Sequence, residues 1–258
     1  MGVDTAFLTD ALGETKVSTS ADALSEHATD WGTQDGTEPD VVVYPETTEE
    51  VSAILAGATD RGVPVTPYAA GTSLEGNPVP AEGGISMNLT RMNDVVDVRP
   101  GDFQMDVQPG VMGPTIEEAA GEEGLFFPPL PSSGDISTIG GMIANAASGM
   151  QTVKYGEVAD WVLELEVVLA DGSVITAGSK AVKTSSGYNL RDLIIGSEGT
   201  LGVVTEATLE LAGRPEQIRG GRALFPDLST ATAAVTDIIQ SGVDVAKIEL
   251  IDEESAMM

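Results

Sequence analysis

Three stretches rich in glycine, alanine, serine and threonine carry the strongest chemical signal in this chain of 258 residues. They read Ala70-Gly-Thr-Ser-Leu-Glu-Gly76, Ser137-Thr-Ile-Gly-Gly-Met-Ile-Ala-Asn-Ala-Ala-Ser-Gly149 and Gly196-Ser-Glu-Gly-Thr-Leu-Gly202. Glycine lets the backbone adopt positive φ and leaves main-chain N–H groups open to a bound anion. Three such stretches on one chain predict a single extended ligand that contains phosphate.

Each stretch also has a purely structural interpretation. In the first, Gly71 and Gly76 would supply the positive φ values of an ordinary turn. In the second, Gly140 and Gly141 would allow close packing where a helix begins. In the third, Glu198 would cap backbone N–H groups ahead of a strand. The prediction of a ligand site therefore depends on the three stretches together, since a short glycine motif alone is a weak signal.

Two common phosphate-binding motifs do not occur in the sequence. No two glycines stand two positions apart, which argues against a G-x-G-x-x-G dinucleotide site, and there is no G-x-x-x-x-G-K-[ST] sequence. The first stretch contains no Lys or Arg, so a pyrophosphate there must be bound by main-chain N–H groups and by the hydroxyls of Thr72 and Ser73. Asn145, a polar side chain among alanines, is expected to hydrogen-bond a partner if it is buried.

Composition excludes several classes of function. The 41 acidic residues against 12 basic ones give a net charge of −29, and nucleic acids or anionic membranes need a basic face. The acids are dispersed, which favours the salt-rich cytoplasm of a halophile over an acidic interaction tail. With no cysteine and one histidine, neither disulfides, thiol catalysis nor a metal site is expected. No stretch is long and apolar enough to span a bilayer.

The elements that must position the three stretches follow from the hydrophobic pattern. A strand over 40–44, a helix that Thr47 caps and Gly62 ends, and a strand over 63–68 form a β-α-β unit that leads directly into the first stretch. Asp171-Gly172 predicts a hairpin turn. Further strands are expected over 85–89, 95–98, 103–107, 162–169, 174–176 and 201–211, and a helix from Pro114 to Glu123.

The two ends of the chain differ from this middle part. Residues 1–36 have a helical, polar pattern and are expected to be loosely attached. Beyond Arg214-Pro215 we expect a strand over 223–225, a helix between Asp227 and Gly242, a strand over 246–251 and a helix beginning at Asp252. This tail has too few elements to cover both faces of a sheet.

Taken in order, these segments resemble the FAD-binding domain of the vanillyl-alcohol oxidase / p-cresol methylhydroxylase (PCMH) flavoproteins, and most closely the FAD subunits of D-lactate dehydrogenase and glycolate oxidase. The resemblance covers nearly all of residues 36–215.

It implies an α+β fold in which a PCMH-type domain of two α/β subdomains precedes the beginning of a truncated α+β cap domain. The implied divisions are an N-terminal helical segment over 1–35, the FAD-binding domain over 36–213 and the incomplete domain over 214–258. The matching sequences are Val41-Val-Val-Tyr-Pro45, Ala70-Gly-Thr-Ser-Leu-Glu-Gly76, Ser137-Thr-Ile-Gly-Gly141, Lys154-Tyr-Gly156, Leu169-Ala-Asp-Gly172 and Gly196-Ser-Glu-Gly-Thr-Leu-Gly202.

The same resemblance implies a set of FAD-binding residues. Residues 67–73 would wrap the pyrophosphate, 132–138 and 145–148 would line the flavin and its phosphate arm, and 198–204 would contact the adenine-ribose or the flavin. Ala69 stands where the family usually has glycine, at a cost of about 1 kcal/mol if that position needs positive φ. The full set is Pro67, Tyr68, Ala69, Ala70, Gly71, Thr72, Ser73, Gly76, Pro131, Ser132, Ser133, Ser137, Thr138, Gly140, Gly141, Asn145, Ala147, Ser148, Glu198, Gly199, Gly202, Val203 and Val204.

The function implied is oxidation of a small 2-hydroxy acid, of the D-lactate or glycolate type, by hydride transfer to FAD. Some relatives attach the flavin covalently through His, Cys or Tyr, but cysteine is absent and His27, upstream of the fold, is expected at the surface, so non-covalent FAD is predicted. No residue is singled out as the catalytic base, because the family takes it largely from the second domain. A second chain or further sequence would complete the substrate site, and a partner would provide any attachment to a membrane. The alternatives are a non-catalytic flavin carrier or structural subunit of a redox complex, and an inactive truncated product.

Overall fold

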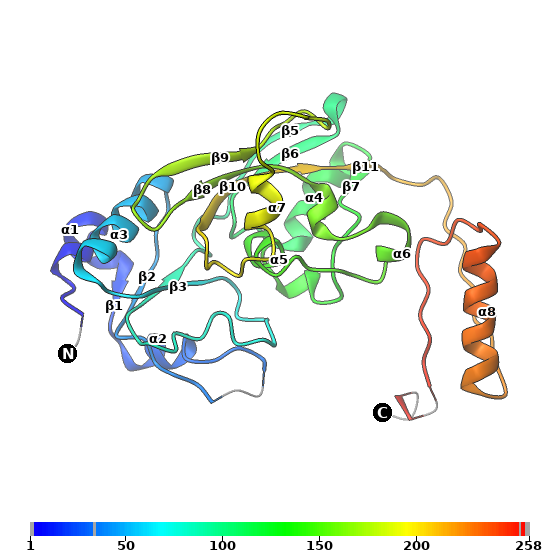
Figure 1. Ribbon diagram of the computed structural model, residues 1–258, viewed down its shortest axis with the longest axis horizontal. Coiled ribbons are helices and arrows are strands. Elements are labelled where there is room, and N and C mark those ends of the chain that lie inside the picture. The colour runs from blue at the N-terminus through cyan, green and yellow to red at the C-terminus, as the bar shows by residue number, and fades with distance from the viewer. Residues whose placement is uncertain (1–2, 33–34, 253, 256–258) are drawn as a thin grey trace.

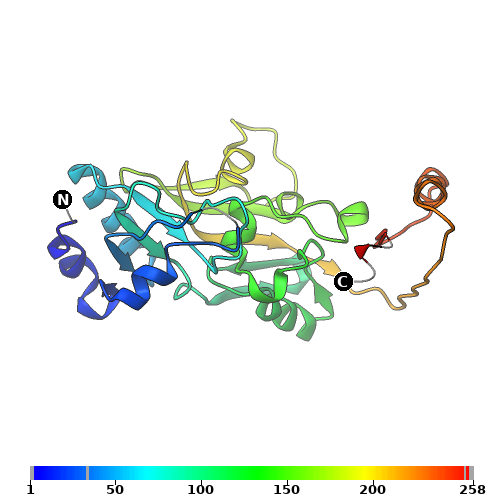
Figure 2. The same ribbon diagram turned by 90° about the horizontal axis from the view of Figure 1, so that it is seen from below.

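The computed structural model describes residues 3–32, 35–252 and 254–255. It is an α+β protein in which two lobes, each built on its own sheet, lie side by side, and a C-terminal segment extends away from the second lobe (Figures 1 and 2). Among the described residues, no helix has both the length and the apolar character that a bilayer crossing requires.

The first lobe contains a four-stranded sheet with the order β1-β2-β4-β3. Strands β2 (Val41–Val43), β4 (Ile85–Asn88) and β3 (Val65–Tyr68) are parallel, and β1 (Val17–Ser18) is antiparallel to β2. Helix α3 (Thr48–Arg61) is the crossover between β2 and β3, as the β-α-β pattern predicts. Its ends are those expected: the Thr47 hydroxyl accepts the Glu50 N–H at 3.3 Å, and Gly62 ends the helix at φ 64°.

The second lobe contains a five-stranded antiparallel sheet with the order β5-β6-β10-β8-β9. The Asp171-Gly172 turn joins β8 and β9, which confirms the predicted hairpin. The helices of this lobe are α4, α5, α6 and α7, and Figure 1 shows α4, α5 and α7 on one side of the sheet. The strand and helix bounds are β5 Val95–Arg99, β6 Gln104–Val107, β8 Val162–Val168, β9 Val174–Gly178, β10 Val203–Glu210, α4 Gly113–Glu122, α5 Ile139–Ala144, α6 Thr152–Tyr155 and α7 Leu190–Ile194. A small ribbon of β7 (Leu125–Phe126) and β11 (Ala212–Gly213) lies beside them.

Each lobe has its own apolar core, and the two cores share strands. The first core lies between α1 (Ala6–Leu12), α3 and the parallel sheet. Val168 of β8 and Val203 of β10 also belong to this core, whereas most buried residues of those strands belong to the second core. Because single strands contribute to both cores, the lobes are held in a fixed relation.

The N-terminal segment is firmly packed, so the expectation of loose attachment is wrong. Leu8 is fully buried and Leu12 nearly so, both in the first core. Strand β1 pairs with β2, and helix α2 (Ala21–Glu26) leads into His27, which is 0% exposed. The prediction that His27 lies on the surface is also wrong. A polar pattern of short helices did not reveal which of their few apolar residues enter the core.

The C-terminal segment is only partly as predicted. Helix α8 (Leu228–Gln240) forms where expected, with the Asp227 carboxylate accepting the Thr230 N–H at 2.7 Å. Residues 223–225 and 246–251 form no strands, because no partner strand lies beside either segment in the described chain. The helix expected from Asp252 falls partly outside the described residues. No residue of α8 is buried.

Candidate functional site

A cavity of about 430 Å³ is lined by the three small-residue stretches, which come together from both lobes. All the residues expected from the sequence line it except Gly76 and Ser132. Ala146 also lines the cavity, as expected from the range 145–148. Further lining residues were not predicted, although most are sequence neighbours of predicted ones: Leu74, Glu75, Asn77, Pro78, Leu89, Pro109, Met142, Ala144, Ile194 and Ser197. Met142 and Ile194 are apolar residues on helices. From sequence alone, such a residue cannot be distinguished from one that packs in the core.

The 69–73 loop, which follows β3 directly, carries a run of five consecutive unpaired donors that lines the cavity. Within the described part of the chain, the main-chain N–H groups of Ala69, Ala70, Gly71, Thr72 and Ser73 have no hydrogen-bond acceptor. Main-chain N–H groups in a folded protein are nearly always paired with protein, water or a ligand. Successive donors without side-chain cations suit a phosphate group, which accepts several N–H groups at once.

The 69–73 loop is held from below and at its C-terminal end. The Tyr68 side chain packs under Gly71, whose φ is 66°, so that a Cβ atom at position 71 would overlap the Tyr68 hydroxyl. The Trp31 N–H donates to the Ser73 carbonyl at 3.0 Å. The Thr72 hydroxyl lies 2.9 Å from the Ser137 hydroxyl, which joins the first stretch to the second. The loop is therefore a fixed feature of the fold.

The second and third stretches are joined to each other through main-chain hydrogen bonds. The Gly196 N–H donates to the Ile143 carbonyl and the Glu198 N–H to the Ala144 carbonyl, both at 3.0 Å, so the third stretch satisfies the carboxyl end of α5. Glu198 (φ 53°) and Ala146 (φ 45°) are non-glycine residues in the left-handed region. Both line the cavity, and strain of this kind clusters at ligand sites.

Ala69 is not strained. Its φ is not positive. Within the described chain, the non-glycine residues with positive φ are Phe103, Ala146 and Glu198. The cost of about 1 kcal/mol expected for an alanine with positive φ therefore does not apply at position 69. The strain that exists in the site is instead at Ala146 and Glu198, two positions that the sequence pattern did not identify as strained.

The electrostatic character of the cavity is neutral to acidic. None of its lining residues is Lys, Arg or His, and its carboxylates are Glu75 and Glu198. Hydrogen bonds from the Ser73 hydroxyl and the Leu74 N–H lower the pKa of Glu75 below its usual value, so this carboxylate is charged at neutral pH. Asn145 joins the same cluster: it accepts from Asn77 at 3.2 Å and donates to Glu75 at 3.4 Å.

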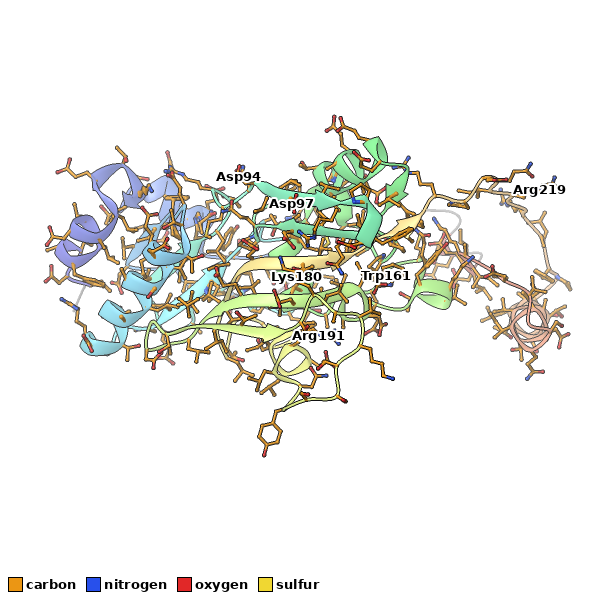
Figure 3. All side chains as sticks on the ribbon, turned by 90° about the horizontal axis from the view of Figure 1, so that it is seen from above. Asp94, Asp97, Trp161, Lys180, Arg191 and Arg219 are labelled. Atoms are coloured by element: carbon orange, nitrogen blue, oxygen red, sulfur yellow. The ribbon has the colours of Figure 1, made fainter. Side chains whose placement is uncertain are left out.

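The strongest ion pairs lie outside the cavity, on the exposed side of the five-stranded sheet. Asp106 is 4% exposed and accepts hydrogen bonds from Arg99, Lys180 and Thr208 at 2.6–2.8 Å. Burial alone would raise the pKa of Asp106, but these donors outweigh it and lower that pKa. Figure 3 shows Lys180 and Asp97 over this sheet and Arg219 far out on the C-terminal segment. Arg99 and Lys180 therefore serve the fold and not the cavity.

The comparisons with known proteins agree with this geometry. Residues 39–178 match the family model described as FAD binding domain. The chain is 40% identical over 244 residues to a protein named probable D-lactate dehydrogenase, mitochondrial, of Danio rerio, covering 93% of this chain and 49% of that protein. It is 40% identical over 220 residues to glycolate oxidase subunit GlcD of Bacillus subtilis, covering 85% and 47%.

A solved structure of alkyldihydroxyacetonephosphate synthase superposes with a TM-score of 0.80 at 27% sequence identity, covering 92% of this chain and 45% of that one. The chain thus spans about half the length of each of these three proteins.

Proposed function

Because this chain belongs to the family of PCMH-type FAD-binding domains, we propose that it is the flavin-holding part of an oxidoreductase acting on a small 2-hydroxy acid. The observation that carries this proposal is the 69–73 loop, whose run of main-chain N–H groups lacks acceptors within the described residues and lines the cavity. Its donors suit the pyrophosphate of FAD in number and chemistry.

The residues of the cavity fit a flavin nucleotide held without a covalent bond. The 69–73 loop would take the pyrophosphate, with the Thr72 hydroxyl as a further donor. Residues 132–138, 145–148 and 198–204 would line the flavin and the adenine-ribose, where small side chains leave room for flat rings. Cysteine is absent from the chain and its single histidine lies outside the cavity, so neither can attach the flavin.

The chemistry of the reaction would come from the cofactor, since a bound flavin accepts the electrons that a hydroxy acid loses. The chain's own residues bind and orient the cofactor and exclude water from it. They do not supply a clamp for a substrate carboxylate, because the described lining has no cation. We assign that clamp and the catalytic base to the half of the relatives' length that this chain does not span, or to a second chain.

The same lack of a cation favours one alternative function. A chain that binds FAD but offers no group to a hydroxy acid would be a flavin carrier, with no turnover of its own.

We further propose the division into an FAD-binding domain over 36–213, an N-terminal segment over 1–35 and the start of a cap domain over 214–258. A salt-rich cytoplasm remains our proposal for the setting, given the net charge of −29.

Anaerobic flavin reduction tests these proposals. The purified chain is loaded with FAD, dialysed, and mixed with D-lactate or glycolate while the flavin absorbance is followed. Retained absorbance that bleaches with a hydroxy acid supports the dehydrogenase, with or without an added partner chain. Retained absorbance that no hydroxy acid bleaches supports the flavin carrier. Failure to retain or bind FAD in a folded protein contradicts both and leaves an inactive product.

A further inference from the structure

The one histidine of this chain is buried beneath the 69–73 loop and outside the residues that match the family model. His27 is 0% exposed and follows helix α2. Its ring centroid lies 4.2 Å from that of Tyr68, the same tyrosine that packs under Gly71. A stack of three residues, His27, Tyr68 and Gly71, therefore connects the N-terminal segment to the loop that lines the cavity.

The hydrogen bonds of His27 define its neutral form. Nδ1 lies 2.8 Å from the Ala23 carbonyl, which can only accept, so Nδ1 carries the proton. Nε2 lies 2.8 Å from the amide nitrogen of Asn88 and must accept from it. The Asn88 amide cannot turn around freely, because its oxygen accepts the Thr90 N–H at 2.9 Å. A proton added at Nε2 would face the Asn88 N–H₂ group with no acceptor.

The surroundings of His27 offer little to stabilise a positive charge. Burial is the largest effect and lowers the pKa of His27, against smaller opposite effects from the Ala23 carbonyl and Glu26. Tyr44 and Tyr68 pack against the ring, and burial raises the pKa of each phenol, so both stay neutral. The remaining charged groups near these rings are Asp30, near Tyr68, and Arg91, whose guanidinium lies 4.8 Å from the Tyr44 ring centre.

The segment that follows His27 ties down the C-terminal end of the loop and the residues just beyond it. The Trp31 N–H donates to the Ser73 carbonyl at 3.0 Å, and Asp30 accepts the Gly76 N–H at 2.7 Å. If His27 left its buried position, the Tyr68 support and these two anchors would be disturbed together. Release of this one residue would therefore change the whole loop.

We infer that His27 is a positioning residue that keeps the 69–73 loop in its cofactor-binding form, and that protonation of its ring releases the loop. This inference rests on the proposed binding of FAD by that loop. The supported form contains neutral His27 and the released form accepts a proton with the ordinary pKa of about 6.5. Affinity for FAD is then complete while His27 is neutral and falls once the pH drops below the pKa of His27 in the free protein, which burial holds below 6.5, because the competent fraction shrinks.

The decisive measurement is the dissociation constant of FAD against pH for the wild type without a histidine tag and for His27→Gln. Glutamine can donate to the Ala23 carbonyl and accept from Asn88, but it does not titrate. We expect the wild-type affinity to fall by up to about tenfold per pH unit once the pH is below the lowered pKa of His27, one proton being coupled. For His27→Gln we expect a change of less than about twofold over the same range. Equal slopes in the two proteins would overturn the inference.

A matched control is Glu206→Gln. Burial raises the pKa of Glu206, which makes it the other group expected to titrate toward neutral pH, and it does not line the FAD cavity. Its pH profile of FAD affinity should equal that of the wild type. A flat profile in Glu206→Gln would assign the effect to Glu206 and overturn the role of His27.

Two further measurements keep the test informative if the glutamine variant does not fold or FAD does not bind. The chain has one histidine, so its ring proton resonance reports the pKa of His27 in the wild type. Linkage requires this pKa to be lower with FAD bound than without, and equal values would overturn the inference.

If FAD fails to bind near neutral pH, the proposed function fails instead. Amide exchange of residues 69–73 then decides: it should rise in the wild type relative to His27→Gln once the pH is below the lowered pKa of His27, and equal exchange would overturn the inference.

Discussion

Gly71 lies directly over the Tyr68 phenol, so closely that a methyl group at position 71 would overlap the hydroxyl oxygen. The contact joins the last residue of β3 to the loop that it supports. It explains why this position holds glycine: the backbone has φ 66°, and the space where a side chain would stand is already filled.

Replacement of Gly71 by alanine should therefore displace the loop. We expect Gly71→Ala to weaken FAD binding by about tenfold or more and to lower the free energy of unfolding by about 1–3 kcal/mol. The matched control is Gly62→Ala, which has φ 64° but open space around the added methyl and lies outside the cavity. It should lose about 1 kcal/mol of stability and bind FAD normally. Fluorescence titration with urea denaturation measures both, and equal FAD affinity in the two variants would refute the role of the contact.

The affinity for FAD should rise with salt. The cofactor brings a dianionic pyrophosphate to a chain with net charge −29, through a cavity whose lining has no cation in the described residues. Raising KCl from about 0.1 M to about 1 M shortens the screening length from about 10 Å to about 3 Å and relieves this repulsion. We expect the dissociation constant to fall by about threefold or more. Weaker binding at the higher salt, with near-UV circular dichroism showing a folded protein at both, would contradict this prediction.

Glu75 is the carboxylate expected to contribute most to that repulsion. Its oxygen accepts the Ser73 hydroxyl at 2.8 Å, beside the proposed phosphate donors. We expect Glu75→Gln to bind FAD a few-fold more tightly than the wild type at low salt and equally at about 1 M KCl. Glu82→Gln removes the same charge from an exposed position of the same lobe outside the cavity and should change neither value. Titration of both variants at the two salt concentrations tests this, and unchanged low-salt binding by Glu75→Gln would exclude a local effect.

Asp106 should contribute strongly to stability. It is nearly buried and faces Arg99 and Lys180, so an amide in its place leaves Lys180 without its carboxylate partner and Arg99 with Asp97 alone. We expect Asp106→Asn to lose about 3 kcal/mol of unfolding free energy at neutral pH. Asp97→Asn removes the more exposed partner of Arg99 and should lose less than about 1 kcal/mol.

The effect of Asp106 also has a pH dependence of known sign. Because its pKa is lowered in the folded state, the stabilisation is complete above the unfolded value of about 3.9 and is lost as the pH falls below it. The stability difference between the wild type and Asp106→Asn should therefore shrink in acid. Urea denaturation of both proteins at a series of pH values measures it, and a difference that stays constant down to about pH 3 would disprove the coupling.

Local patterns were enough to predict the β-α-β unit, the hairpin and helix α8, because caps, turn residues and apolar spacing lie within a few residues of one another. The strands expected over 223–225 and 246–251 did not form. Their apolar sequences fit a strand, but a strand also needs a neighbour to accept its main-chain hydrogen bonds, and the described chain offers none.

The sequence by itself determined the fold class, the family and the three segments that line the cavity, since each depends on residue types at short spacing. Only the tertiary structure decided that His27 is buried under Tyr68, that Ala146 and Glu198 are strained while Ala69 is not, and that the cations pair away from the cavity. The reason is physical: burial, positive φ at a non-glycine residue and ion pairing are imposed by contacts between residues far apart in the sequence, and no local pattern records those contacts.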